Sequence, residues 1–345
     1  MGLFGFGKRG KKPVVVRVFG KTDLGKTREH NEDCFLVADL TRGEASLKPE
    51  VREHAVGELG SLFIVADGMG GAAGGEVASS MGADSVFRHL NVAWRGDDER
   101  TPEQFALRLR EGVEAANKTI HHYAREHPEL KGMGTTCTAA GLLDETLYLA
   151  QVGDSRAYLI RGGEPVQLTK DQSLMQRLVD AGELTEEEAA RSERRNIILQ
   201  ALGPDDKVKV DLTRQQLRRG DVLVLCTDGL FGQVSKDEIA EVAAHTNDLV
   251  GMCNELVDRA NQRGGPDNIT VVVARFGGDG LRAPQLGDQI GHHSYRVSDE
   301  DTPTEPALAL GVVRASAGSA RRLAVGAMIA AGLLMALLLF GGVIP

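Results

Sequence analysis

The sequence predicts an α+β fold built on antiparallel strands. Two apolar runs of strand-forming residues, 62–65 and 221–227, are each followed closely by an Asp-Gly pair, and helix-forming stretches come after both pairs. Between them, residues 134–168 alternate with a period of two and contain two-residue connections such as Asp144-Glu145. Connections this short join antiparallel neighbours, because parallel strands require long crossovers.

The bulk composition fits one globular domain with appendages. Of 345 residues, 42 % are hydrophobic and 26 % are charged, which is enough to bury a full core. The net charge of −9 argues against a nucleic-acid-binding protein, which needs a basic surface. The cysteines lie far apart without C-x-x-C spacing, so we expect buried thiols in a reducing compartment rather than disulfides or zinc ligands. They are Cys34, Cys137, Cys226 and Cys253.

The elements of the first third of the chain follow from periodicity and turn residues. Residues 1–13 are glycine-rich and basic, which predicts a flexible N-terminus, and the polar stretch 41–60 predicts an insertion. The expected strands are 14–19, 34–38 and 62–65, and the expected helices are 75–90 and 102–126. The second helix has apolar residues at three-to-four spacing, so it buries one face.

The rest of the domain contains a strand-rich region, a polar helical region and a final set of helices and strands. Residues 170–200 predict a small surface subdomain, here named the flap, with helices at 173–181 and 185–194. The other expected helices are 236–245 and 249–262. The expected strands are 135–143, 146–152, 157–161, 165–168, 221–227 and 269–276.

The C-terminal part differs in composition from the rest. Residues 277–322 lack periodicity, which predicts a flexible linker with the pair His292-His293 in solvent. Residues 323–344 are apolar without one charge and long enough for a single transmembrane helix. Because Arg321-Arg322 flanks the N-terminal end of this segment, the positive-inside rule predicts a cell-membrane protein whose main domain faces the cytoplasm.

The glycine-rich corner after Asp67 allows more than one interpretation. Residues 68–73 match the G-x-G-x-x-A pattern of dinucleotide-binding turns. That interpretation needs an acidic residue about 20 positions on, at the end of a second strand, whereas Arg88 stands there and another helix follows. Asp67 would also repel a pyrophosphate. A dinucleotide site is therefore disfavoured, and a tight turn without chemistry is the plain alternative.

Three carboxylates far apart in the sequence stand at expected strand ends. Asp67 and Asp228 each follow a strand, and Asp267 precedes the last one. A sheet can bring such ends to one edge, where their mutual repulsion would require cations. Oxygen ligands without His or Cys select Mg²⁺ or Mn²⁺, and two such ions can acidify a water and hold a phosphoryl oxygen. The pattern predicts metal-dependent hydrolysis of a phosphate ester.

Six motifs in order carry a resemblance to a known family. They are Thr22-Asp23-Leu24-Gly25 with Arg28 and Asn31-Glu32-Asp33, Val65-Ala66-Asp67-Gly68-Met69-Gly70-Gly71, Gly134-Thr135-Thr136, Val152-Gly153-Asp154-Ser155-Arg156, Thr227-Asp228-Gly229-Leu230 and Asp267-Asn268-Ile269-Thr270. With these motifs, residues 14–276 resemble the bacterial type 2C (PPM) metal-dependent protein serine/threonine phosphatases. The resemblance implies a four-layer α-β-β-α sandwich of two antiparallel sheets flanked by helices. It also implies hydrolysis of phosphoserine and phosphothreonine by a water that two Mn²⁺ or Mg²⁺ ions activate.

The resemblance further implies a role for each matching residue. Asp67 would bridge the two metal ions, with the Gly68 carbonyl on the second ion. Asp228 and Asp267 would complete the first metal site, and Asp154 would share a third, weaker metal with Asp228. Glu32 and Asp33 would hold water molecules that are bound to the ions. Arg28 would bind the substrate phosphate, and Asn268 would orient the site.

Two departures from the family pattern affect the chemistry. Met69 stands where animal members carry a histidine proposed as general acid, so the resemblance names no proton donor for the leaving serine or threonine. In the flap, Asp171-Gln172-Ser173 stands in place of Asp-His-Ser, and Ser192-Glu193 in place of His-Pro. Substrate preference is therefore not carried over from relatives.

The implied function is a membrane-tethered phosphatase that opposes Ser/Thr kinases, with those kinases and their targets as expected partners. Two alternatives stay open. The same fold could serve as a membrane-tethered pseudophosphatase, a scaffold that binds phosphoproteins, which loss of metal carboxylates would mark. The substrate could instead be a small phosphomonoester, and competition between a phosphopeptide and a small ester would decide.

Overall fold

The computed structural model describes residues 12–70 and 74–297 of the chain. Among these residues, no helix is both long and apolar enough to cross a membrane. The predicted transmembrane segment, 323–344, lies outside the described part, as do residues 1–11 of the predicted basic N-terminus.

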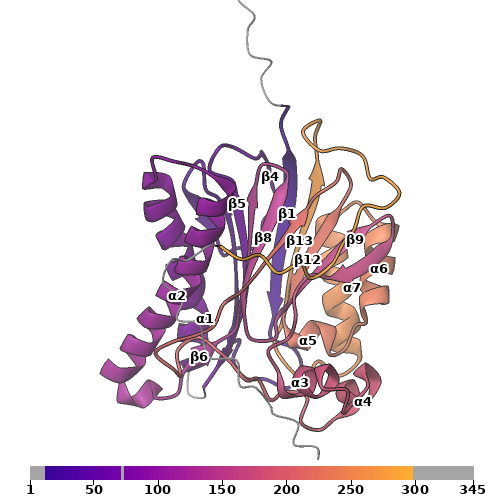
Figure 1. Cartoon of the computed structure of the whole chain (residues 1–345). Helices are drawn as coiled ribbons and strands as arrows, with labels where there is room; N and C mark the ends of the chain where they lie inside the picture. The colour runs from indigo at the N-terminus through magenta and orange to yellow at the C-terminus, as the bar shows by residue number, and fades with distance from the viewer. Residues whose placement is uncertain (1–11, 71–73, 298–345) are drawn as a thin grey trace, which may run out of the picture. The chain divides into compact units, whose positions relative to one another are not determined.

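Two antiparallel sheets form the centre of the fold (Figure 1). The first sheet has six strands in the order β10-β9-β12-β13-β1-β4. They are β1 (Val15–Asp23), β4 (Arg52–Ala55), β9 (Arg156–Arg161), β10 (Glu164–Gln167), β12 (Val222–Cys226) and β13 (Ile269–Gly277). The second sheet has the order β11-β8-β7-β5-β2-β3, with β6 paired to β5. Its strands are β2 (Asp33–Asp39), β3 (Glu44–Ser46), β5 (Ser61–Met69), β6 (Gly134–Thr135), β7 (Cys137–Leu143), β8 (Thr146–Val152) and β11 (Asp211–Gln216).

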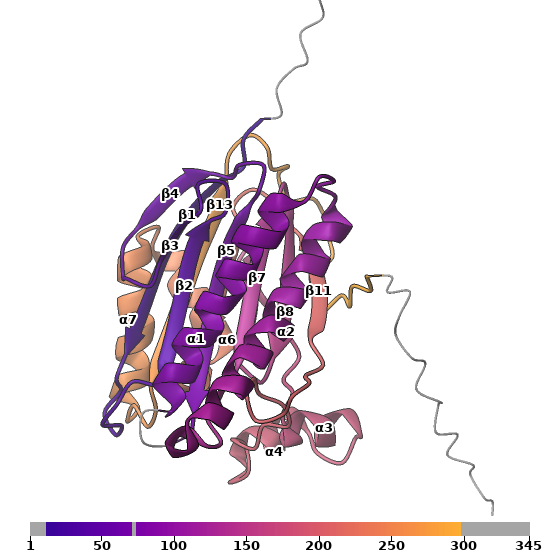
Figure 2. The ribbon, with the colours of Figure 1, turned by 90° about the vertical axis from the view of Figure 1, so that its left-hand side faces the viewer.

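Helices cover the outer face of each sheet, so the predicted four-layer α-β-β-α sandwich is confirmed. Helices α1 (Gly74–His89) and α2 (Pro102–Glu126) pack on the second sheet, in front of β2, β5, β7 and β8 in Figure 2. Helices α6 (Lys236–His245) and α7 (Leu249–Gln262) pack on the first. The short α5 (Asp228–Phe231) follows β12, and the flap contributes α3 (Leu174–Asp180) and α4 (Glu186–Arg191) at one end of the sandwich.

Apolar side chains alternate between the inner and outer faces of the strands. In β2, Phe35 and Val37 join the core between the sheets, while Leu36 joins the core beneath α1 and α2. Strand β5 repeats this with Phe63 on the inner side and Ile64 on the outer side. Because both faces are buried, these strands read as continuous apolar runs, and their ends are fixed firmly in space.

Several helices begin at side-chain caps that the sequence shows directly. The Thr101 side chain accepts from the Gln104 backbone N–H at 3.1 Å, and Pro102 takes the first helical position of α2. Ser235 and Glu238 form a reciprocal capping box at the start of α6. The predicted bounds of α2, α6 and α7 are confirmed.

Three strands are absent from the sequence prediction. Strands β3 and β4 fall within the predicted polar insertion 41–60, and β11 falls where no element is expected. Each pairs with a neighbour on one side along the sheet, β3 with β2, β4 with β1 and β11 with β8. Such strands lack an apolar run, and pairing with a distant segment decides their conformation.

The strand order within residues 134–168 differs from expectation at one point. The β7–β8 and β9–β10 pairs are antiparallel neighbours as predicted. Strands β8 and β9, however, lie in different sheets, so the turn at residues 153–155 crosses from one sheet to the other. The backbone of this turn bonds to side chains and to the flap instead of continuing a hairpin ladder. This crossing is important for the site, because Asp154 lies in it.

The first part of the predicted linker lies against the domain, so the prediction of a flexible linker is wrong for residues 278–297. We name residues 281–297 the strap. Leu281 is 2 % exposed, and the Tyr295 backbone N–H donates to the Leu212 carbonyl at 2.7 Å. His292 Nε2 lies 2.8 Å from Asp211 Oδ2, so this histidine is not simply solvated as predicted. The open edge of β11 supplies the backbone partners that the composition of the strap does not reveal.

Candidate metal centre

Strands from both sheets bring five aspartates to one end of the sandwich. Asp33 begins β2 and Asp67 lies near the end of β5, and the two residues are paired directly across these antiparallel strands. Asp228 begins α5 after β12, and Asp267 lies just before β13. Asp154 lies in the turn that crosses between the sheets. The structure thus brings the three predicted carboxylates together from two sheets rather than along the edge of one.

Burial and mutual repulsion disfavour the charged forms of these carboxyls. Desolvation raises the pKa of Asp33 to about 7, and the nearby charges of Asp228 and Asp267 add to the effect. Burial and the charge of Asp228 raise the pKa of Asp154 to about 7. Burial, followed by the charge of Asp33, raises the pKa of Asp67 well above its ordinary value. The cluster is stable in its ionised form only beside compensating cations.

The donor set fits a hard divalent cation. Carboxylate oxygens converge here, and such ligands suit Mg²⁺ and Mn²⁺. Asp228 Oδ1 is buried without a hydrogen-bond partner, which is the kind of acceptor that a cation would satisfy. Within residues 12–70 and 74–297, however, no three His, Cys, Asp or Glu side chains already stand in ligating geometry around one point.

Arg28 is bonded to one of the predicted ligands. Its Nη2 donates to Asp267 Oδ2 at 2.7 Å, and the arginine side chain is 48 % exposed. This hydrogen bond raises the pKa of Arg28, so the guanidinium is a fixed positive charge beside the aspartates. Arg28 and Asp267 both line a pocket beside the aspartates.

Asn268 ties the loop between β1 and β2 to the start of β13. Its Oδ1 accepts from the Glu32 backbone N–H at 2.8 Å, and its Nδ2 donates to the carbonyls of Leu24 and His30 at 3.0 Å each. The Asn268 backbone N–H donates to Asp267 Oδ1 at 2.9 Å. Asn268 is 4 % exposed, so its side chain is buried beneath the site and holds the backbone next to the predicted site residues in place through these hydrogen bonds.

Threonines that stand in the family motifs, but for which the sequence predicted no role, form a series of hydrogen bonds that reaches Asp33. Thr227 Oγ1 donates to Asp33 Oδ2 at 2.8 Å and accepts from the Thr270 backbone N–H at 3.0 Å. Thr270 Oγ1 in turn donates to Thr22 Oγ1 at 2.7 Å, and Asn31 Nδ2 donates to the same oxygen at 2.9 Å. The sequence contained one signal for these roles. Each threonine lies in or next to an apolar strand, where a buried hydroxyl requires a hydrogen-bond partner.

Glycine is required in both Asp-Gly pairs because other chain segments pass very close. A Cβ on Gly68 would lie 2.2 Å from the Gly75 carbonyl oxygen and 2.4 Å from the Glu32 carbonyl oxygen. A Cβ on Gly229 would lie 1.9 Å from the Asn268 carbonyl oxygen. The glycines therefore allow the backbones around the aspartates to approach one another without a side chain between them.

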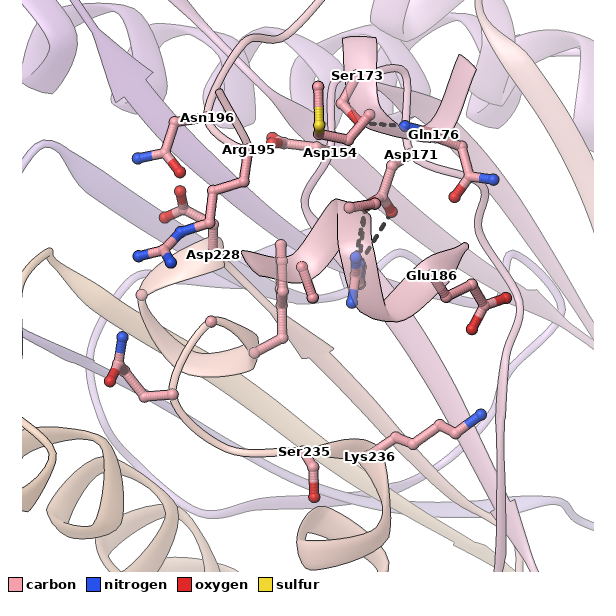
Figure 3. A pocket seen from close by; sticks show the side chains of 18 of the residues that line it. Asp154, Asp171, Ser173, Gln176, Glu186, Arg195, Asn196, Asp228, Ser235 and Lys236 are labelled. Atoms are coloured by element: carbon pink, nitrogen blue, oxygen red, sulfur yellow. Dashed lines mark hydrogen bonds and ion pairs between the residues drawn. The ribbon is translucent and has the colours of Figure 1, made fainter. Parts of the chain in front are cut away.

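A pocket of about 480 Å³ opens beside the aspartates (Figure 3). Arg28, Asp154, Asp228 and Asp267 line it, together with residues of the flap and of the segment that leads into α6. Figure 3 shows side chains from both sides of this space, including Ser173, Gln176, Glu186, Arg195 and Asn196 from the flap. The predicted flap therefore forms one wall of the pocket that adjoins the aspartates.

Comparison with known proteins adds to this geometry. A family model described as protein phosphatase 2C matches residues 52–288. The chain belongs to the protein phosphatase 2C family. Among curated relatives, this phosphatase is 37 % identical over 254 residues to the serine/threonine phosphatase stp of Listeria monocytogenes, covering 73 % of this chain and 93 % of that protein. It is 36 % identical over 261 residues to the phosphatase PstP of Mycobacterium tuberculosis, covering 76 % of this chain and 45 % of that protein.

Solved structures of the family share the fold. The serine/threonine phosphatase of S. agalactiae is 33 % identical with a TM-score of 0.65, and the match covers 75 % of this chain and 99 % of that one. The catalytic domain of PstP in complex with two manganese ions is 37 % identical with a TM-score of 0.61, covering 76 % and 99 %. The predicted resemblance to the bacterial type 2C (PPM) phosphatases is therefore confirmed.

Proposed function

We propose that this phosphatase hydrolyses phosphoserine and phosphothreonine in proteins, with Mn²⁺ or Mg²⁺ bound among the aspartates. The observation that carries the proposal is the convergence of five aspartates from two sheets beside a pocket that also contains Arg28. The names of the relatives support the substrate class, and the PstP complex with two manganese ions supports the metal.

The positions of the side chains suggest which of them hold metal. Asp67 would be shared by two metal ions, with the Gly68 carbonyl beside it, and Asp228 and Asp267 would complete one site. Asp154, close enough to Asp228 to be affected by its charge, is the candidate for a third site. When bound, such ions acidify an attacking water and withdraw charge from the phosphoryl group.

The remaining site residues act on water and substrate. Glu32 and Asp33 would orient water in the centre, and the bond from Thr227 fixes the Asp33 carboxylate for that task. Arg28 would bind two phosphate oxygens through its planar fork, which positions the phosphorus near the aspartates. Arg28 would also neutralise charge that develops on the phosphoryl oxygens during hydrolysis.

The first prediction concerns Asp67. Replacing this carboxylate by an amide, Asp67→Asn, removes the anion that would balance two cations, so we expect at least about a thousandfold loss of rate, roughly 4 kcal/mol of barrier. The measurement is phosphate release from a phosphothreonine peptide by the full chain with Mn²⁺, with Mg²⁺ and with chelator. Asp206→Asn, on an exposed loop, serves as the matched control. Turnover in excess chelator, or near-normal turnover of Asp67→Asn, would contradict the proposal.

The extent of the pocket favours a protein substrate over a small ester. Its lining runs from Arg28 to Lys236 at the start of α6 and includes the flap, which is more surface than a phosphate group alone can contact. We therefore expect a phosphothreonine peptide to compete with p-nitrophenyl phosphate and to have the higher kcat/KM. If the small ester has the higher kcat/KM, the substrate class is a small phosphomonoester.

Attachment to the membrane is part of the same proposal. The apolar, uncharged segment 323–344, with Arg321-Arg322 before it, supports a single-pass anchor with the phosphatase domain in the cytoplasm. In that place the enzyme would oppose membrane-bound Ser/Thr kinases and act on their targets. The four buried, free cysteines of the domain suit a reducing compartment.

A further inference from the structure

Two asparagines of α7 bond to side chains near the end of β1. Helix α7 packs on β1, and Lys21 Nζ donates to Asn254 Oδ1 at 2.8 Å. Two positions further along the strand, Asp23 Oδ1 accepts from Asn261 Nδ2 at 3.0 Å. The asparagines are seven positions apart, which places them on one face of the helix. Because Asp23 is the last residue of β1, the second bond joins α7 to the loop that contains Arg28.

The same Asp23 oxygen also fixes the start of this loop. It accepts a second hydrogen bond, from the Gly25 backbone N–H at 3.0 Å. Gly25 has a φ of +77°, and a Cβ there would lie 2.2 Å from the carbonyl oxygen of Asp267. The loop therefore passes directly against the residue whose side chain bonds to Arg28, and only glycine fits at this point.

The Asn261 side chain also lies against the turn that precedes β13. The Lys26 backbone N–H donates to the Gly265 carbonyl at 2.8 Å, so the loop is bonded to this turn. A Cβ on Gly265 would lie 2.5 Å from Asn261 Oδ1 and 3.0 Å from the Lys26 nitrogen. Pro266, the next residue of the turn, lines the same pocket as Arg28. The amide is thus close to both segments that form this wall of the pocket.

The end of α7 does not require the side chain of Asn261. The Gly264 backbone N–H donates to the Asn261 carbonyl and the Gly265 backbone N–H to the Ala260 carbonyl, at 3.1 Å each, so backbone groups close the helix. Among the residues that the structure describes, no donor reaches the buried Asn261 Oδ1. A buried acceptor without a partner costs stability. Helix stability therefore does not explain this amide, whereas the bond to Asp23 requires its N–H.

We propose that Asn261 is a positioning residue for Arg28. Through Asp23, its amide fixes the backbone just before Arg28, and this backbone presents the guanidinium to the substrate phosphate. Asn268 holds the two ends of the same loop, so the two amides act on different parts of it. The inference rests on the proposed function, which assigns phosphate binding to Arg28.

A double-mutant cycle in the full chain with Mn²⁺ tests this role. Asn261→Leu removes the donor at similar side-chain size, and we expect the KM for a phosphothreonine peptide to rise about fivefold with a smaller fall in kcat. The Ki of inorganic phosphate as a competitive inhibitor should rise by the same factor. In an Arg28→Ala background, Asn261→Leu should change KM by less than about twofold, because the side chain that it positions is absent.

Two further variants control for the substitution itself. Asn254→Leu makes the same chemical change on the same face of α7 and removes the bond to Lys21, so it should leave KM unchanged. Asn261→Asp keeps the shape of the side chain but cannot donate when ionised, so it should raise KM as Asn261→Leu does. Thermal unfolding in chelator checks that each variant is folded, and calorimetric titration should show unchanged affinity for Mn²⁺.

The outcomes separate the positioning role from the proposed function. If Arg28→Ala raises KM and the Asn261 variants do not, the positioning role is overturned and the proposed function stands. An equal rise in KM from Asn261→Leu with and without Arg28 overturns it as well, because the effect would then not pass through the guanidinium. Weaker Mn²⁺ binding with an unchanged KM would assign the effect to Asp267 and overturn the role too. If the wild type releases no phosphate with Mn²⁺, the proposed function itself is wrong.

Discussion

Arg28 lines the same pocket as Asp154, Asp228 and Asp267, and it donates a hydrogen bond to Asp267. A residue in this place can contribute to substrate binding as well as to the chemical step. If it binds phosphate in the ground state, its loss raises KM, whereas a group that acts only in the transition state lowers kcat alone. The kinetic effect of a substitution therefore distinguishes these roles.

We expect Arg28→Ala to raise the KM for a phosphothreonine peptide about tenfold or more and to lower kcat. Arg28→Lys should restore little, because an ammonium cannot make two parallel bonds to phosphate oxygens. Steady-state kinetics with Mn²⁺ provide the measurement, and Arg42→Ala, an exposed arginine paired with Asp39, provides the control. An unchanged KM in Arg28→Ala would assign phosphate binding elsewhere.

The raised pKa values of Asp33 and Asp154, each about 7, predict an unusual dependence of stability on pH in metal-free protein. A carboxyl has a pKa of about 3.9 when unfolded, so these groups bind protons more tightly in the folded state. The stability that they contribute is fully present below about pH 4 and is lost as the pH rises through 7. We expect the Tm of the metal-free protein to fall between pH 5 and 8 and Mn²⁺ to restore it at pH 8.

The comparison with Asp33→Asn isolates this effect. His54, whose pKa is lowered by burial, contributes stability in the opposite direction as the pH rises, and it is common to both proteins. The difference in Tm between wild type and Asp33→Asn, measured by calorimetry at several pH values, should therefore shift in favour of the variant as the pH increases. A difference that is constant with pH would show that Asp33 does not titrate in this range.

At the scale of elements, the strap extends the domain beyond the last strand. Residues on it pack into two cores, with Leu281 between the sheets and Tyr295 against the core beneath α1 and α2. Tyr295 contacts Tyr148 edge to face at 5.7 Å between ring centroids, and Arg214 lies 4.9 Å above its ring. Arg218 forms two bonds to Asp288, at 2.7 and 2.8 Å.

We expect a chain that ends at Phe276 to be less stable than one that ends at Val297. Loss of the buried Leu281 and of the Tyr295 contacts should reduce the free energy of unfolding by about 3 kcal/mol, which corresponds to roughly 6–12 °C in Tm. Calorimetry of the two truncated chains measures the difference, and Tyr295→Ala in the longer chain should show part of it. Equal Tm values would mean that the strap adds no net stability and that the domain ends at β13.

For the whole molecule, the proposed membrane attachment rests on the segment 323–344. About 25 residues separate Val297 from that segment, and a chain of this length spans at most about 90 Å when fully extended. An anchor would therefore confine the pocket to a shell near the bilayer, where the effective concentration of membrane-bound substrates is high.

We expect the full chain to fractionate with membranes, to resist extraction by high salt and carbonate, and to be released by detergent. A chain that ends at Val297 should be found in the supernatant with the same kcat/KM for a free peptide. Protease added outside intact cells should leave the domain uncut. Recovery of the full chain in the supernatant would contradict the anchor, and digestion of the domain by external protease would contradict its orientation.

Much of the site was predictable because its residues carry strong local signals. Buried strands read as apolar runs, the aspartates at their ends are conspicuous, and capping residues such as Thr101 and Ser235 mark where helices begin. The motifs around Asp67 and Asp228 were sufficient to indicate the family. None of these signals requires knowledge of a distant segment, since each depends on the chain within a few residues.

Local patterns in the sequence were enough to predict the strand ends that carry carboxylates, the chemistry that such carboxylates favour and the bounds of the main helices. The sequence does not show that β8 and β9 lie in different sheets, that Asp154 is near enough to Asp228 to be affected by its charge, or that the strap bonds to the edge of β11. Nor does it show that Arg28 bonds to Asp267, 239 positions away. These features share one cause. Each involves a polar group that finds its partner only after remote segments have packed together. This is true of a strand edge, of a buried amide such as Asn268 and of the Arg28 guanidinium, and no local sequence pattern indicates the partner.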